Sequence, residues 1–129
     1  MDCVDSDAII GILRNVPGAS ELSQNLDRIG NVATTSINAY EVLFGAKKSI
    51  DENKISEVRN ILAKFEILQF DEKVAEEASR IHNELEKRGE QLDMRDMFIG
   101  SIALANGCTI ITRNVKHFSK IKGLKVEKW

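Results

Sequence analysis

Residues 93–114 read DMRDMFIGSIALANGCTIITRN, and this stretch indicates the fold class. Its first part, Asp93 to Ala105, is the most apolar helical segment of the chain, and its small residues allow close packing. The β-branched run Thr109 to Thr112 follows and is typical of a buried strand. A buried helix that leads into a short strand favours an α/β domain with a mostly parallel sheet.

The rest of the chain repeats this alternation of helices and strands. Apolar periodicity predicts strands at 3–4, 32–35, 67–70, 109–112 and 124–126, and helices at 8–13, 22–29, 37–48, 55–65, 74–85 and 93–105. We therefore predict one α/β domain over residues 1–129, with a central, mostly parallel sheet flanked by helices in three layers. Functional sites in such sheets lie at the carboxyl ends of the strands.

Composition narrows the class of protein. The chain has 129 residues, of which 43% are hydrophobic and 29% charged, as expected for one globular domain. No apolar run approaches the roughly 20 residues that span a bilayer. The start, MDCVDSD, carries acids where a signal peptide carries Lys or Arg. We expect a cytoplasmic protein without membrane contact, in which Cys3 and Cys108 are buried, reduced thiols.

The net charge of −2 argues against a general nucleic-acid coat protein, but the charge is unevenly distributed. Residues 113–128 hold six Lys and Arg side chains and one acid, Glu127. We predict that Arg113 and Lys116 of this basic segment contact the phosphates of RNA. The alternative is that the segment is only a solvated tail.

Three acids stand next to apolar runs on three different elements. Asp5 follows the first strand, Glu41 shares a helix face with Ile37 and Phe44 that we expect to enter the core, and Asp96 opens the apolar helix. Each has an ordinary alternative role. Asp5 fits an N-cap, Glu41 fits a partner of an Arg or a border residue, and Asp96 fits a capping box with Asp93.

Convergence of the three acids favours a metal site over the separate roles. Neighbouring carboxylates repel one another and take up protons unless a cation lies between them. Mg²⁺ or Mn²⁺ prefers oxygen ligands and activates water for attack on a phosphodiester. We therefore predict that Asp5, Glu41 and Asp96 bind the metal and catalyse hydrolysis.

Four motifs carry a resemblance. The segments VDSDAIIGILR, TTSINAYEVLFGA and RDMFIGSIALANGC, followed by TIITRNVKHF, resemble a PIN domain, and within that family a VapC-type toxin ribonuclease. The resemblance runs essentially end to end. It implies a PIN-like fold and a metal-dependent endoribonuclease, the toxin of a type II toxin–antitoxin pair. It also implies three partners: an RNA substrate, a cognate small antitoxin and a second copy of the chain in a homodimer.

Matched position by position, the resemblance places Asp5, Glu41 and Asp96 on the metal-binding acids of the family. Asn114 stands where some members have a fourth Asp, and is our fourth candidate catalytic residue. His117 stands where many members have an acid. The missing fourth carboxylate implies one metal ion, or a second that assembles only with substrate.

Three other polar residues receive local roles. Asp7 is expected to cap the first helix, and Thr112 either brings a hydroxyl near the site or simply ends its strand. His82 lies on the apolar stripe of its helix and is interpreted as a core histidine.

Other functions remain open from the residues alone. Asp5 and Asp7 fit the nucleophile and acid of a haloacid-dehalogenase-like phosphohydrolase, although no acidic pair follows Thr112. A phospho-receiver domain has a similar size but leaves Glu41 unexplained. A catalytically weakened PIN-like module that only binds RNA or protein is the third alternative, because the fourth acid is missing.

Overall fold

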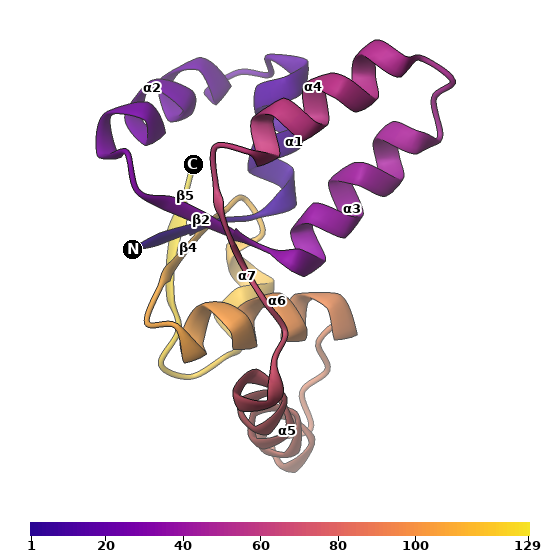
Figure 1. Ribbon diagram of the computed structural model, residues 1–129. Helices are drawn as coiled ribbons and strands as arrows, with labels where there is room; N and C mark the ends of the chain where they lie inside the picture. The colour runs from indigo at the N-terminus through magenta and orange to yellow at the C-terminus, as the bar shows by residue number, and fades with distance from the viewer.

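The computed structural model describes residues 1–129 and alternates strands with helices around one sheet (Figure 1). The strands are β1 (Asp2–Val4), β2 (Val32–Thr35), β3 (Glu66–Leu68), β4 (Thr109–Thr112) and β5 (Lys125–Lys128). The helices are α1 (Ser6–Arg14), α2 (Ala19–Ile29), α3 (Ser36–Lys47), α4 (Glu52–Leu62), α5 (Glu72–Lys87), α6 (Met94–Ala105) and α7 (Val115–Phe118). The sheet has the order β3-β2-β1-β4-β5, and every neighbouring pair is parallel.

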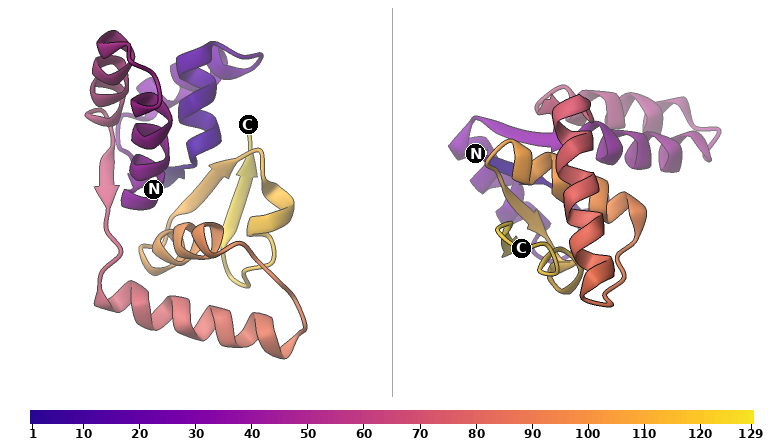
Figure 2. Two further views of the ribbon diagram at one scale, coloured as in Figure 1. Left: turned by 90° about the vertical axis from the view of Figure 1, so that its right-hand side faces the viewer. Right: turned by 90° about the horizontal axis from the view of Figure 1, so that it is seen from below.

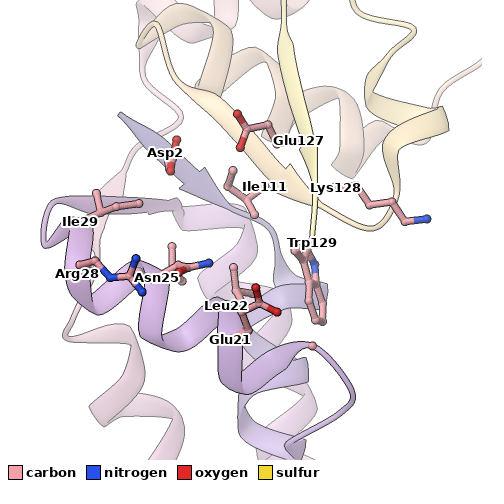
Figure 3. Close-up of a pocket in the computed structure, with 12 residues that line it drawn as sticks. Asp2, Glu21, Leu22, Asn25, Arg28, Ile29, Ile111, Glu127, Lys128 and Trp129 are labelled. Atoms are coloured by element: carbon pink, nitrogen blue, oxygen red, sulfur yellow. The ribbon is translucent and has the colours of Figure 1, made fainter.

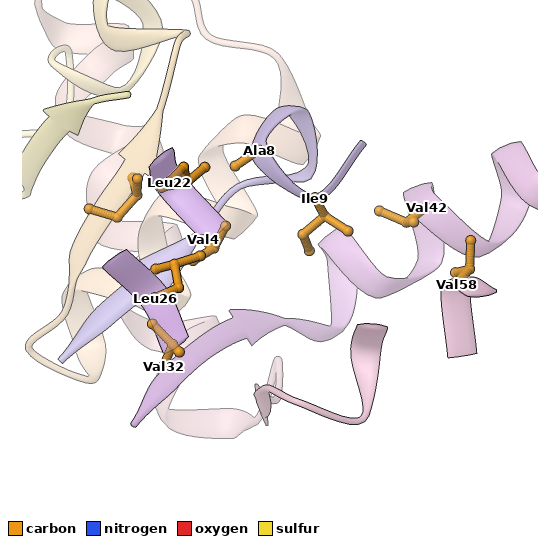
Figure 4. Packing of buried hydrophobic residues seen from close by; sticks show 9 residues of the cluster. Val4, Ala8, Ile9, Leu22, Leu26, Val32, Val42 and Val58 are labelled. Carbon is orange, nitrogen blue, oxygen red and sulfur yellow. The ribbon is translucent and has the colours of Figure 1, made fainter. Parts of the chain in front are cut away.

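The sheet lies between two helical layers, which confirms the predicted α/β class and its three layers (Figure 2). On one face, Val4 and Ile111 pack with residues of α1 to α4, among them Leu22 and Val58 (Figure 4). The adjacent strand residue Cys3 points the other way and packs with α5 and α6. Successive strand residues thus supply both cores, because side chains alternate across a strand.

The rotation of α3 differs in part from the expectation that Ile37, Glu41 and Phe44 face the core: Ile37 does pack against the core, but Phe44 does not. Phe44 is 52% exposed and stacks on Tyr40, whereas the buried residues of the helix are Asn38 and Val42. The cause is the capping box at its start, where the hydroxyl of Thr35 accepts from the backbone N–H of Asn38. This box turns Asn38 inward and leaves Glu41 partly exposed at the border.

Helix α5 follows its predicted apolar stripe, but the interpretation of His82 as a core residue is wrong. Val74, Ile81 and Leu85 are buried, while the His82 side chain is 46% exposed and lies 3.4 Å from Glu86. Each residue of a helix is rotated about 100° from the one before it. His82 therefore lies beside the buried stripe that contains Ile81, on the side that faces solvent.

The remaining differences are at element ends. β3 ends at Leu68, so Phe70 lies beyond it and packs on Phe98, and β5 begins at Lys125 rather than residue 124. The short helix α7 was not predicted, and its last residue, Phe118, is fully buried.

Cys3 and Cys108 are buried free thiols, as predicted. Among the helices, none has the length and apolarity required to cross a bilayer.

Gly100 lets α6 lie close to Ile121, and we predict that Gly100→Ala destabilises the protein. A Cβ at this position would overlap Cδ1 of Ile121, which is itself buried. Overpacking of this kind costs about 1–3 kcal/mol, more than the gain in helix propensity of about 1 kcal/mol. Urea denaturation measures the change.

The matched control is Gly45→Ala in α3, where a Cβ meets nothing within 4 Å. This variant should gain up to about 1 kcal/mol of stability. Equal effects of the two substitutions would show that the contact with Ile121 does not constrain α6.

Candidate active site

Asp5 lies at the carboxyl end of β1, the central strand of the sheet, and is only 7% exposed. Its Oδ1 accepts hydrogen bonds from the backbone N–H of Ser6 at 2.8 Å and from Nδ2 of Asn38 at 2.9 Å. Its Oδ2 accepts from the hydroxyl of Thr112 at 2.7 Å. Asp5 therefore caps α1, as the ordinary interpretation expected, and also joins β1, α3 and β4.

Burial raises the pKa of Asp5 from its ordinary 3.8 to about 6. The hydrogen bond from Thr112 opposes this rise, and the nearby negative charges of Asp7 and Asp96 add to it. An ionised Asp5 is thus stabilised by donors but lacks a neighbouring cation.

Asn38 is fully buried and has all its polar groups paired. Its Oδ1 accepts from the Thr35 hydroxyl at 2.7 Å, which fixes the orientation of the amide. Its Nδ2 donates to Asp5 and, at 2.8 Å, to Oγ of Ser6. Sequence reasoning missed this residue, although a polar residue three positions after Thr35 is a recognisable capping signal.

Glu41 reaches the same site through Ser6. Its Oε1 accepts from the Ser6 hydroxyl at 2.9 Å, and its side chain is 25% exposed. Its Oε2 lies 3.7 Å from Nη1 of Arg95, a long ion pair whose Arg is well exposed. Glu41 therefore has an Arg partner, as one alternative expected, yet it also faces Asp5 across Ser6.

Asp96 occupies the third position of α6, but the capping box expected with Asp93 does not form. Asp93 accepts from the backbone N–H of Arg95 and caps the helix alone. The carboxylate of Asp96 instead lies 3.1 Å from Nδ1 of His117. The same ring nitrogen lies 2.8 Å from Nδ2 of Asn114, so the loop after β4 meets the start of α6 at this point.

The expectation that Asp7 caps α1 is wrong, because Asp5 is the N-cap. Asp7 instead accepts from the backbone N–H of Arg113 at 2.8 Å and from Nε1 of Trp129 at 3.0 Å. The guanidinium of Arg113 stacks on the Trp129 ring and donates to the carbonyl of Pro17. Two residues were predicted to contact RNA. Lys116 is exposed and makes none of these contacts, whereas Arg113 also links the loop after β4 to Trp129 and Pro17.

The candidate catalytic residues thus gather at the carboxyl edge of the sheet, from β1, α3, α6 and the loop after β4. Their oxygen donors suit a hard divalent cation, and the pKa of Asp5 is raised first by burial and further by the charges of Asp7 and Asp96. In the arrangement shown, however, no three His, Cys, Asp or Glu side chains form a closed ligand cluster. Donors of Ser6, Asn38 and Thr112 instead form hydrogen bonds with Asp5 and Glu41.

A cavity of about 490 Å³ lies elsewhere, between α2 and β5 (Figure 3). Its lining mixes the acids Asp2, Glu21 and Glu127 with the bases Arg28 and Lys128. It contains none of the candidate catalytic residues, so this cavity is separate from the site at the strand ends.

Comparison with known proteins agrees with this geometry. Residues 3–124 match the PIN domain family. Ribonuclease VapC1 of Methanocaldococcus jannaschii is 35% identical over 106 residues, which are 80% of this chain and 75% of that protein. The tRNA(fMet)-specific endonuclease VapC of Salmonella typhimurium is 27% identical over 98% of this chain and 96% of its own length. The crystal structure of DNA-bound VapBC from the same organism matches with a TM-score of 0.89, at 25% identity, over 99% of this chain and 97% of that one.

The chain belongs to the PIN domain family, and its relatives place it among the VapC ribonucleases of that family. The resemblance noted from the sequence motifs is therefore confirmed. Ribonucleases with PIN domains depend on metal ions as a class, which agrees with the oxygen-rich site.

We predict that the metal-free protein loses stability as the pH rises through the titration of Asp5. A raised pKa favours the protonated carboxyl in the folded state, so its contribution is complete below about pH 4 and lost above about pH 6. Asp5→Asn should be free of this loss, because an amide resembles the protonated acid. Between pH 4 and pH 7 the wild type should lose roughly 2 kcal/mol relative to Asp5→Asn.

Urea denaturation in EDTA at several pH values measures this difference. Added Mg²⁺ at pH 7 provides the control, because it should stabilise the wild type and leave Asp5→Asn almost unchanged. A difference between the two proteins that is constant across this range would contradict the role of Asp5 as the buried, titrating acid.

Proposed function

We propose that residues 1–129 form a single PIN-like nuclease domain that hydrolyses RNA phosphodiesters internally, as the toxin of a type II toxin–antitoxin pair. The observation that carries the proposal is the Asp5 network. A buried acid at the end of the central strand is aimed by three donors toward the edge where Glu41 and Asp96 also lie. This arrangement supports metal-assisted hydrolysis on a fold shared with the VapC ribonucleases.

We assign Asp5, Glu41 and Asp96 as the ligands of Mg²⁺ or Mn²⁺, and Asn114 as the fourth polar residue of the catalytic group. Bound there, the ion would supply an activated water and stabilise the leaving oxygen. Asn38 and Thr112 orient the Asp5 carboxylate, and Ser6 aligns Glu41 with it. Asn114 and His117 contribute uncharged or weakly basic groups where a fourth acid would add repulsion.

The proposed partners follow from the relatives. The solved relative from Salmonella typhimurium is a VapBC complex, so we propose a cognate small antitoxin for this chain. A homodimer is supported by the exposed, stacked rings of Tyr40 and Phe44 on α3, which a second copy would cover. A cytoplasmic location stays a prediction.

The structure does not favour the alternative functions. A haloacid-dehalogenase-like mechanism needs Asp7 as a mobile proton donor, but this carboxylate is tied to Arg113 and Trp129. A PIN-like module that binds without cutting is the alternative that a cleavage assay separates directly.

We predict that the protein cleaves single-stranded or looped RNA with Mg²⁺ or Mn²⁺ and that EDTA stops cleavage. Asp96→Asn should also abolish cleavage while leaving the metal-free protein as stable or more stable, because it removes one repulsive charge near Asp5. It should reduce the increase in melting temperature that millimolar metal produces.

The measurements are gel assays of RNA cleavage and thermal melts of both proteins, with EDTA and with metal. Cleavage that survives EDTA would refute the metal mechanism. An active Asp96→Asn protein with an intact metal response would remove Asp96 from the ligand set.

Lys116 is predicted to contact an RNA phosphate next to the site. Lys116→Ala should raise the apparent KM for RNA without lowering kcat, and should reduce the slope of log affinity against log salt by about 0.7. Lys64→Ala is the matched control, since Lys64 is exposed just before β3, at the opposite edge of the sheet. An equal salt slope for wild type and Lys116→Ala would show that the basic segment is only solvated. Arg113→Ala is less informative because Arg113 also holds the loop.

A further inference from the structure

Trp129, the only tryptophan of the chain, lies beside Arg113 in the loop after β4, although it is far from Asp5 in sequence. Strand β5 pairs with β4 so that Lys128 lies opposite Thr112. The next residue, Trp129, is thereby brought against Arg113 at the carboxyl edge of the sheet. Figure 3 shows the indole at the end of β5, pointing toward the layer of α1 and α2.

Three independent contacts fix the indole. Its Nε1 donates to Oδ1 of Asp7 at 3.0 Å, and the guanidinium carbon of Arg113 lies 3.6 Å from the ring centroid. The edge of the ring covers Gly11 so closely that a Cβ there would overlap it. We call Trp129, Asp7 and the stacked Arg113 the Trp129 clamp.

The second oxygen of Asp7, Oδ2, connects the clamp to Thr112 and Arg113, next to the candidate catalytic residues. This oxygen accepts from the backbone N–H of Arg113 at 2.8 Å and lies 3.3 Å from the hydroxyl of Thr112. The hydroxyl has one proton, and its shorter contact is with Asp5 at 2.7 Å, so Asp7 chiefly holds the Arg113 amide. The same Thr112 oxygen accepts from the backbone N–H of Asn114 at 2.9 Å.

We propose that Trp129 is a positioning residue, which acts through Asp7 to fix residues 112–114, so that Thr112 orients Asp5 and Asn114 stays against His117, the partner of Asp96. The proposal rests on the proposed ribonuclease function. Trp129 itself forms no hydrogen bond with the three acids assigned as metal ligands, because its indole N–H donates to Asp7.

The test uses Trp129→Phe, which keeps an aromatic ring over Gly11 and under Arg113 but removes the N–H donor. We expect kcat for RNA cleavage to fall roughly tenfold, the loss of one hydrogen bond to a charged group, with KM for RNA unchanged. Asp7→Asn should act similarly, and the double variant should be no worse than the more damaged single variant. Additive losses would show that Trp129 does not act through Asp7.

Val126→Ala is the matched control, because Val126 packs on the core from the same strand without touching Asp7. If it lowers kcat as much as Trp129→Phe does at equal loss of stability, the clamp merely holds β5 and the proposal fails.

A second readout does not depend on activity. In the metal-free protein, hydrogen exchange of the Arg113 backbone amide should be several times faster in Trp129→Phe than in wild type or Val126→Ala. Unchanged exchange would overturn the proposal. If wild type cuts no RNA with either metal, the proposed function fails, and the exchange of the Arg113 amide alone decides whether the clamp exists.

Discussion

The burial of one carboxylate, Asp5, is the constraint on which the rest of the site depends. A charged group with 7% of its surface exposed is costly unless donors surround it. Ser6 supplies its backbone N–H as the first residue of α1, Asn38 its amide as part of the α3 cap, and Thr112 its hydroxyl at the end of β4. Three elements must therefore be correctly placed before this acid is satisfied; α3 also carries Glu41, and the loop after β4 carries Asn114.

The electrostatic balance around Asp5 explains the composition of the edge. Asp5, Asp7, Glu41 and Asp96 bring four acids, and the partners of the outer ones are Arg95, His117 and the Arg113 amide. None of these donors reaches Asp5, whose pKa is raised to about 6. The charges of Asp7 and Asp96 add to the rise in the Asp5 pKa that burial causes, and a cation bound beside Asp5 would relieve this repulsion.

The sequence predicted the elements with strong periodicity and the positions of the acids, but not the contacts between elements. The stripe of α5 and the β-branched run of β4 were found because each is a local pattern. The rotation of α3 was misjudged, since large apolar residues such as Phe44 suggested the buried face while the capping box of Thr35 and Asn38 decides it. The roles of Asn38, Arg95 and Trp129 depend on partners from distant elements, which strand register and not local sequence determines.

The strand order places the first strand of the chain next to the fourth, and this has a consequence for the timing of synthesis. The hydrogen bond from Thr112 to Asp5 joins residues 107 positions apart. While the chain emerges from the ribosome, β1, β2 and their helices exist before the loop that completes the edge. A nascent chain that ends before Thr112 can carry Asp5, Glu41 and Asp96, but it lacks the hydroxyl that joins β4 to Asp5. The edge that holds Asp5 is therefore completed only after β4 has been made and has paired with β1.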